Sequence, residues 1–533
     1  MFASTSALAG RFALMTHARS ASGVTMSGTT ATPAVQSYKA LKGLLQEVSA
    51  LSEIQGILGY DEQVFMPAGA AASRAAQKGA LAKIIHDKST SAEMKEAIEG
   101  VRGCEDDFDD VRIRANIRDA VDHYDKDARK SSELAQKEAQ LESEANQAWA
   151  KARAASDFSL FSGKLTEIFE LKKEVAALTR PALKDEPYDG ALDAFERGMR
   201  ASRLDVIFDE LRTGLVPLLD AINAKKAADA SIDAPHPALA FGEQWDTAAQ
   251  AELSRKIAAR MGYSFENGRL DVSTHPFTGG AGPQDVRMTT RFSANWAEGF
   301  GATIHETGHA LYEQGRDLGE EGRLLPSSQA LSMGVHESQS LLWERMVLAA
   351  VEAEPEPQPS HPHPHPHHHH PNPHPNPNPN PKLNPNQVLQ SKEFWQFAAP
   401  LFHEAFPFTA EASADDFYKT YNRVAPGCIR VEADEVTYPL HDPNPNPNPN
   451  PNPNPNPNPN PYPNPNPKQV TYPLHVILRY DIERKLFRGE MTVDEVTHEP
   501  PRTQTLIRTP TPTRSPTPTP TQTQTWPLTR TQT

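Results

Sequence analysis

Apolar residues recur at intervals of three and four along much of the chain, beginning at residue 41. This spacing places them on one face of a helix, as a single stripe that can be buried. The stretch 201–219 repeats the pattern. Clear alternation with a period of two is scarce, so the pattern predicts a mostly helical protein. The first stripe consists of Leu41, Leu44, Leu45, Val48, Leu51, Ile54 and Leu58.

Two other stretches refine this prediction. The segment 126–155 is rich in Ala, Glu, Lys and Gln and lacks proline and glycine, so we expect one long, largely solvated helix there. The segment 269–273, which reads RLDVS, is the best strand candidate and precedes a glycine-rich turn. The expected fold class is all-α, a single large helical domain with minor short strands.

Proline divides the chain into folded and unfolded parts. Of the 49 prolines, 13 lie in 355–385, 13 in 443–467 and 8 in 500–533. Such tracts offer almost nothing apolar to bury and lack backbone donors, so they do not belong to a packed core. We therefore expect low-complexity insertions at 354–390 and 442–469 and a low-complexity tail at 498–533. The folded domain is then divided into 38–353, 391–441 and 470–497.

Charge and cysteine content exclude some functions. The formal net charge is −15, and an acidic protein is a poor match for nucleic acid, whose phosphates are bound mainly by Lys and Arg. The sequence contains no run of 18 apolar residues, so we expect no membrane-spanning helix. Cys104 and Cys428 are too few for a disulfide framework.

The first 46 residues contain no Asp or Glu but have Arg11, Arg19, Lys39 and Lys42 among Ser, Thr and Ala. Acid-free, hydroxyl-rich, weakly basic leaders are typical of mitochondrial or plastid transit peptides. We interpret residues 1–37 in this way and expect an organellar location. The alternative is a disordered start without targeting function, in a cytoplasmic protein.

The strongest chemical signal is the pentapeptide HETGH at residues 305–309. On a helix, the four-residue spacing puts the imidazoles of His305 and His309 on one face, where they can share one zinc ion. Glu306 then points at a metal-bound water. The alternative is a charged helix surface on which these side chains merely cap or pair.

A third ligand must come from elsewhere in the chain. The metzincin pattern requires glycine at 312 and histidine at 315, but Tyr312 and Gly315 stand there. Glu337 fits better, because it opens an apolar-periodic stretch that follows a loop. Its competitors are Glu320, Glu321 and His336, and the alternative for Glu337 is a solvated acid in a first helical turn.

Five motifs in one order carry a family resemblance: HPF at 275–277, DVRMTTR at 285–291, HETGH at 305–309, HESQS at 336–340 and IRVEAD at 429–434. Together they resemble the carboxypeptidase Taq family of zinc metallocarboxypeptidases. The resemblance covers about 38–350, 394–441 and 471–496. It implies a helical fold with a long deep groove, a homodimer, and removal of C-terminal residues from peptides with broad preference.

The resemblance also implies the site residues. His305, His309 and Glu337 would hold one zinc ion per chain, with cobalt or manganese as alternatives, and Glu306 would be the catalytic acid and base. A cation must grip the free carboxylate of the substrate, because a guanidinium distinguishes a chain end from an internal amide. Arg430 is the first candidate and Arg287 the second, each with a structural ion pair as the alternative. His275 either lines the pocket or packs in a turn.

The sequence departs from the family in several places. The family continues beyond residue 496 with a GxxQDxxW segment, which this chain lacks. Residues 361–374 carry eight of the 20 histidines, which we interpret as a disordered insertion rather than a second metal site. The hexapeptide VTYPLH occurs at both 436–441 and 470–475, flanking an Asn-Pro repeat. An inactive or binding-only remnant of such a peptidase is therefore the alternative function.

Overall fold

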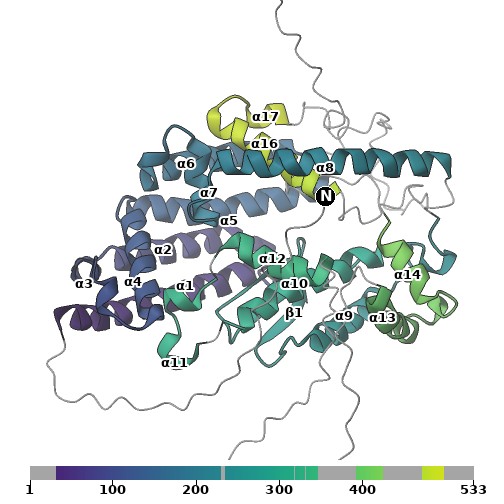
Figure 1. Ribbon diagram of the computed structural model, residues 1–533, viewed down its shortest axis with the longest axis horizontal. Coiled ribbons are helices and arrows are strands. Elements are labelled where there is room, and N and C mark those ends of the chain that lie inside the picture. The colour runs from purple at the N-terminus through teal and green to yellow at the C-terminus, as the bar shows by residue number, and fades with distance from the viewer. Residues whose placement is uncertain are drawn as a thin grey trace, which may run out of the picture.

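The computed structural model describes residues 32–229, 234–316, 318–330, 332–345, 392–423 and 471–496. These residues form a mostly helical fold with one small sheet, which confirms the predicted fold class (Figure 1). Residues 1–31 lie outside the described residues, as do the three low-complexity tracts, Cys428, Arg430 and the first VTYPLH copy. The predicted transit peptide extended to residue 37, but residues 33–37 form the start of the first helix, where Ala34 is buried. None of the described helices is long and apolar enough to cross a bilayer.

The first four helices are α1 (Pro33–Val64), α2 (Ala71–Ser89), α3 (Ala92–Val101) and α4 (Val111–Asp127). Thr32 caps α1 by accepting a hydrogen bond from the Val35 amide, and proline follows at the first helical position, where its missing donor costs nothing. Leu41, Ile98 and Ile117 are fully buried between α1, α3 and α4. The apolar stripe predicted from residue 41 thus begins in a core.

The next four helices are α5 (Ser132–Ala155), α6 (Ser159–Thr179), α7 (Pro187–Phe195) and α8 (Ala201–Ala228). The single helix expected at 126–155 is wrong in two respects. Helix α4 ends at Asp127, and a separate helix, α5, begins at Ser132. Ser131 caps α5 because its hydroxyl accepts a hydrogen bond from the Leu134 amide. In addition, α5 packs between α2 and α6 and buries Trp149. Its small Ala and Ser side chains permit that close packing, whereas composition alone suggests solvation.

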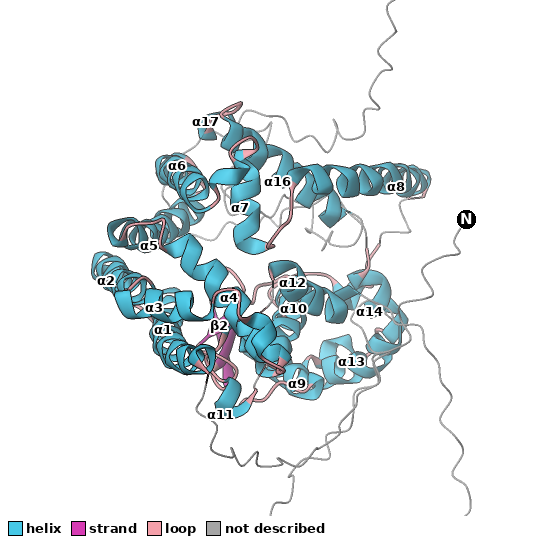
Figure 2. Cartoon of the chain, turned by 60° about the vertical axis from the view of Figure 1, so that its left-hand side comes forward, coloured by secondary structure: helices cyan, strands magenta, loops and turns pink. Residues whose placement is uncertain are grey.

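A three-stranded sheet lies between α1 and α10 (Figure 2). Its strands are β1 (Gly268–Val272), β2 (Thr278–Gly280) and β3 (Val286–Thr290), in the order β1-β3-β2. β1 is parallel to β3, while β2 is antiparallel to it and forms an edge. The strand predicted at 269–273 is present one residue earlier, and the DVRMTTR motif supplies β3.

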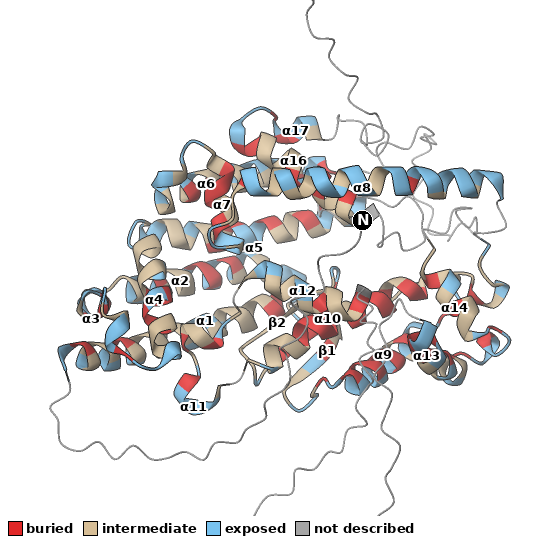
Figure 3. Cartoon of the chain, viewed as in Figure 1, coloured by how far each residue is buried: buried red, intermediate tan, exposed pale blue. Residues whose placement is uncertain are grey.

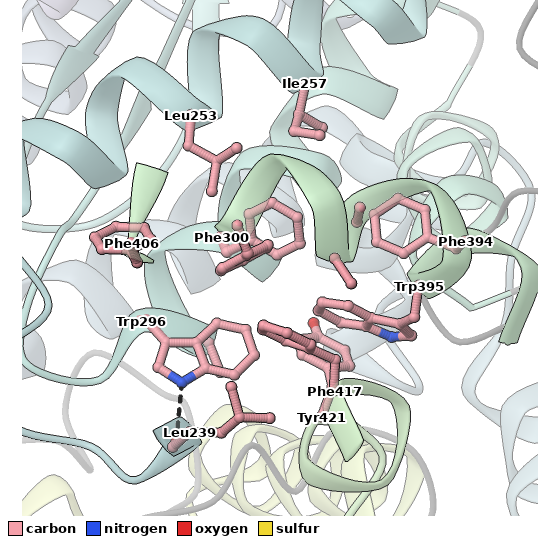
Figure 4. Close-up of a cluster of buried hydrophobic side chains, with 14 of the residues drawn as sticks. Leu239, Leu253, Ile257, Trp296, Phe300, Phe394, Trp395, Phe406, Phe417 and Tyr421 are labelled. Carbon is pink, nitrogen blue, oxygen red and sulfur yellow. Dashed lines mark hydrogen bonds between the residues drawn. The ribbon is translucent and has the colours of Figure 1, made fainter. Parts of the chain in front are cut away.

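The remaining helices carry many of the buried aromatic residues. They are α9 (Thr247–Met261), α10 (Trp296–Gln314), α11 (Gly319–Gly322), α12 (Met333–Arg345), α13 (Lys392–Ala405), α14 (Ala414–Tyr421), α16 (Thr471–Arg488) and α17 (Val493–Val496). Short 3₁₀ helices occur at Ala68–Ala70, Glu105–Asp107, Pro181–Leu183, Pro237–Leu239, Pro326–Ser328 and Pro407–Thr409. An aromatic cluster joins α9, α10, α13 and α14 (Figure 4).

Candidate active site

Helix α10 carries the HETGH motif, and its N-terminal half is anchored in the aromatic cluster. Trp296 is 1% exposed and donates its indole hydrogen to the Leu239 carbonyl at 3.2 Å (Figure 4). Phe300, one turn further on, packs edge-on against Phe402. Because the first half of α10 is fixed by this packing, the histidines in its second half are held in place by a rigid element.

Helix α12 crosses α10 closely enough to bring a carboxylate to the two histidines. A Cβ added at Gly308 would lie 2.6 Å from the Ser340 Cα and 2.8 Å from the Gln339 carbonyl oxygen. Only glycine permits this approach. Glu337 therefore reaches the α10 face that presents His305 and His309, whose ring centroids are 4.9 Å apart.

The three side chains form a compact donor set. Glu337 Oε1 is 3.6 Å from His305 Nε2, and Glu337 Oε2 is 3.3 Å from His309 Nε2. One ligand atom from each residue lies within 4.8 Å of the others. Tetrahedral ligands about 2.1 Å from a zinc ion are about 3.4 Å apart, so these spacings fit such an ion.

Charge within the donor set shifts its pKa values. Burial by itself lowers the pKa of His305, but the hydrogen bond and negative charge of Glu344 outweigh burial and raise it. Burial raises the pKa of Glu337, yet the hydrogen bond from His309 and the charges of His305 and His309 lower it overall. The site thus favours an ionised carboxylate facing the histidines.

Two glutamates that the sequence analysis missed contact histidines at the site: Glu344 contacts His305, and Glu313 contacts His336. Glu344 Oε2 is 2.8 Å from His305 Nδ1, and the Glu344 side chain is only 1% exposed. Glu313, which is ion-paired with Arg316, lies 2.6 Å from His336 Nε2. Helical periodicity contained the signal, because Glu344 follows Glu337 by two turns and Glu313 follows His309 by one.

Glu306 is 6% exposed and is held by strand β2. Thr278 donates its hydroxyl hydrogen to Glu306 Oε2 at 2.7 Å. The preceding HPF motif forms the turn that leads into β2, and the Phe277 amide donates to the Thr289 hydroxyl on β3 at 3.0 Å. The turn therefore places Thr278, which leaves Glu306 Oε1 for another partner.

Two of the predicted substrate-binding residues, Arg287 and His275, contact residues outside this donor set. Arg287, on β3, makes a bidentate ion pair with Asp285 at 2.7 and 2.6 Å, and its guanidinium lies 5.3 Å from the ring centroid of Tyr60. His275 is an exposed residue of the β1–β2 turn, and its ring lies edge-on to Trp149. Arg430 is outside the described residues and stays a prediction.

The competing third-ligand candidates also have other surroundings. Glu321 is exposed on α11 and pairs with Lys42 at 2.6 Å, and Glu320 is exposed beside it. His336 Nδ1 is 2.6 Å from His309 Nδ1, the nitrogen that faces away from Glu337. Glu337 is the candidate that joins both HETGH histidines.

A cavity of about 380 Å³ borders the site. Thr278 and the glycine-rich turn that follows it line one side, and Glu313 and Arg316 line another. Arg323 and Glu53 complete its charged lining. Its volume lies within the range of binding pockets for small ligands or single side chains.

Two imidazoles and a carboxylate that converge beside a second, hydroxyl-bound carboxylate are the arrangement of a metallopeptidase of the HExxH class. The chain belongs to the Carboxypeptidase Taq (M32) metallopeptidase family, whose sequence model matches residues 40–351, 380–442 and 466–499. It is therefore a metallocarboxypeptidase, as the motif order indicated.

Individual relatives agree with this assignment. "Thermostable carboxypeptidase 1" of Thermus thermophilus is 32% identical over 472 residues, covering 86% of this chain and 75% of that protein. The BsuCP crystal structure has a TM-score of 0.65 at 28% identity, over 86% of this chain and 76% of that one. Trypanosoma cruzi metallocarboxypeptidase 1 has a TM-score of 0.63 at 26% identity, with the same coverage.

Proposed function

We propose that this chain is a zinc-dependent carboxypeptidase that hydrolyses the C-terminal peptide bond of peptides, with broad preference for the terminal residue. His305, His309 and Glu337 would hold the ion, and Glu306 would be the general base. The observation that carries the proposal is the convergence of two Nε2 atoms on one carboxylate, at 3.3 and 3.6 Å.

When bound there, zinc supplies Lewis acidity and lowers the pKa of a coordinated water to about 7. Glu306 Oε1 accepts the proton of the attacking water, because Oε2 is already engaged by Thr278. Glu306 then passes the proton to the departing amine. The adjoining cavity offers room for one side chain of the peptide, beside Thr278, the residue that holds Glu306.

Removal and return of the metal tests the first part of the proposal. Dialysis against a chelator should abolish cleavage, and one equivalent of zinc per chain should restore it better than cobalt or manganese. Metal content measured by atomic emission checks the stoichiometry. Bound zinc without any cleavage would instead support the binding-only alternative.

A pair of peptides tests where the chain cuts. The free acid should lose its last residue, while the twin with an amidated C-terminus should remain intact, since it lacks the carboxylate that a guanidinium grips. Mass spectrometry of both digests distinguishes the outcomes. Attack on both peptides would favour an endopeptidase and remove Arg430 and Arg287 from consideration. Peptides that differ in the last residue measure the breadth of preference.

Substitution of Glu306→Gln separates binding from turnover. The variant should keep one zinc ion and lose at least a hundredfold in kcat, because the proton acceptor is gone. Glu404→Gln, an exposed acid on α13 paired with Lys256, is the matched control and should leave kcat unchanged. Retained turnover in Glu306→Gln would refute the assignment of Glu306.

Three further expectations concern partners and location. We expect a homodimer, no binding to nucleic acid and an organellar location. Light scattering coupled to gel filtration, titration with duplex DNA, and imaging of the tagged full-length chain test them in turn.

A further inference from the structure

A continuous row of polar side chains extends from His309 away from Glu337. His309 Nδ1 and His336 Nδ1 are 2.6 Å apart, and His336 Nε2 is 2.6 Å from Glu313 Oε1. Glu313 in turn pairs with Arg316. The side chains of these four residues are between 11% and 18% exposed, so water competes little with their hydrogen bonds.

The chemistry of the row decides where each hydrogen lies. A carboxylate only accepts, so the Glu313 contact requires a hydrogen on His336 Nε2. A neutral His336 then has a lone pair on Nδ1, and the short contact between the two Nδ1 atoms needs one hydrogen. That hydrogen must belong to His309. When a metal ion takes the place of the hydrogen that His309 Nε2 donates to Glu337, the hydrogen on Nδ1 leaves a neutral His309 with its lone pair on Nε2.

We propose that His336 is a positioning residue that fixes the tautomer and ring orientation of His309 so that Nε2 is presented to the metal. The inference rests on the proposed metal site. In the sequence, His336 is a candidate third metal ligand. Both of its ring nitrogens instead contact neighbouring side chains, so we assign it this supporting role. Glu313 and Arg316 hold His336 in this orientation.

The other histidine has a different support. His305 Nδ1 is held directly by a carboxylate, that of Glu344, at 2.8 Å. On its Nδ1 side, His309 is linked to a carboxylate, that of Glu313, only through the imidazole of His336. The ring of His336 is further fixed by Tyr312, whose ring lies edge-on at 5.2 Å. Loss of such outer hydrogen bonds typically weakens metal binding by about 10–100-fold.

Three substitutions at one position test the proposal. Asn places a carbonyl oxygen near the position of Nδ1, whereas Gln places its amide near Nε2 and Phe has no polar atom. We expect His336→Phe and His336→Gln to raise the zinc dissociation constant by about 10–100-fold. His336→Asn should stay within about threefold, because it still accepts the hydrogen of His309 Nδ1. Chelator competition on the full chain measures the constant.

The visible absorption of the cobalt-loaded chain gives a second readout that does not depend on activity. His336→Asn should keep the wild-type band positions and intensities, and His336→Phe should change them. The matched control is His403→Phe on α13, a half-buried histidine bonded to the Ala412 carbonyl at 3.0 Å, which should keep wild-type affinity. Circular dichroism confirms that each variant is folded.

Several results would overturn the inference while leaving the proposed function intact. One is wild-type zinc affinity in a folded His336→Phe variant. Another is an equal loss of affinity in the Asn and Gln variants, which would mean that His336 only fills space. If Phe fails to fold, the Asn and Gln comparison decides alone. Failure of the wild-type chain to bind zinc would overturn the proposed function and this inference together.

Discussion

The helix that carries the site and the helices α8 and α16 differ in how much of their surface is buried and in how many ion pairs they make. Helix α10 buries most of its residues, and Figure 3 shows it largely red. Helix α8 buries only Ala201 and Leu219 and is mostly pale blue in the same figure. Its neighbour α16 packs on α7 and α8 through a small aromatic cluster that includes Tyr188, Tyr480 and Phe487, and ion pairs are added around this cluster.

The charged contacts of α16 centre on Arg484. Its guanidinium lies 2.8 Å from Glu186 and 2.7 Å from Asp205, and Arg488 adds a second pair to Glu186. Tyr480 also donates to Asp205 at 2.7 Å. Buried aromatic side chains carry no charge that salt can screen or acid can neutralise, whereas partly solvated ion pairs are weakened by salt and by acid. The site is thus built on the part of the fold that changes least with conditions.

Removal of the central aromatic side chain should break the comparison most severely. Trp296→Ala leaves a large cavity among Phe402, Phe417 and Trp395, so we expect the free energy of unfolding to fall by about 3–5 kcal/mol. Urea denaturation measures it. Phe408→Ala, at the 40% exposed edge of the same cluster, is the control and should cost about 1 kcal/mol or less. Equal losses would mean that the cluster does not anchor α10.

A methyl group inserted at the close contact between α10 and α12 should have the next largest effect on stability. Gly308→Ala puts a methyl group 2.6 Å from the Ser340 Cα, so the helices must separate at a cost of about 1–3 kcal/mol. Glu337 would move with α12, and zinc affinity should fall. The control is Gly163→Ala on α6, where the added Cβ meets nothing within 4 Å, and which should stabilise by about 0.5–1 kcal/mol. Unchanged zinc affinity in Gly308→Ala would contradict the close-approach argument.

The contact at Gly308 marks the limit of what the sequence predicts about the site. Periodicity and motif order predict the helical class, and the four-residue spacing puts His305 and His309 on one helix face. Periodicity also puts Glu344 on the Glu337 face of α12, but the hydrogen-bond partners of His336 and Glu344 could not be predicted, because they lie across the crossing of α10 and α12. The register of that crossing depends on the contact of Gly308 with Ser340, which no local pattern encodes.

The missed strand and the misjudged helix have related causes. β3 forms from DVRMTTR because its pairing with both β1 and β2 satisfies the backbone, a long-range effect that outweighs a weak local pattern. Helix α5 is buried because α2 and α6 cover it, although its composition suits a solvated helix. The pair of Arg287 with Asp285, by contrast, is the structural ion pair that the sequence offered as the alternative for Arg287.

On the charged side, Arg484→Gln should cost less than either change near the site. It removes both ion pairs, but Glu186 and Asp205 remain 18% and 43% exposed and can be hydrated, so we expect about 1–2 kcal/mol. Urea denaturation in low and high salt should show the loss shrinking as salt rises. The control is Arg479→Gln, whose side chain is 51% exposed and which pairs with Glu483 one turn along α16, with an expected loss of about 0.5 kcal/mol. A loss that does not depend on salt would contradict the ionic origin.

The smallest expected effect is a difference in how acid changes the free energy of unfolding in the two regions. Burial raises the pKa of Glu186, but hydrogen bonds from Arg488 and Arg484 outweigh it and lower the pKa, and those from Tyr480 and Arg484 do the same for Asp205. A lowered folded-state pKa gives stability that is complete above the unfolded value of about 4 and is lost as pH falls through the folded value. The stability difference between wild type and Arg484→Gln should therefore shrink between pH 5 and pH 3, by less than about 1 kcal/mol because solvent screens the 43% exposed Asp205. The stability difference between wild type and Trp296→Ala should stay constant over the same range, because neither tryptophan nor alanine titrates there. Urea denaturation of the three proteins at pH 7, 5, 4 and 3 measures both differences, and a parallel fall in both would remove the distinction between the aromatic and the charged side.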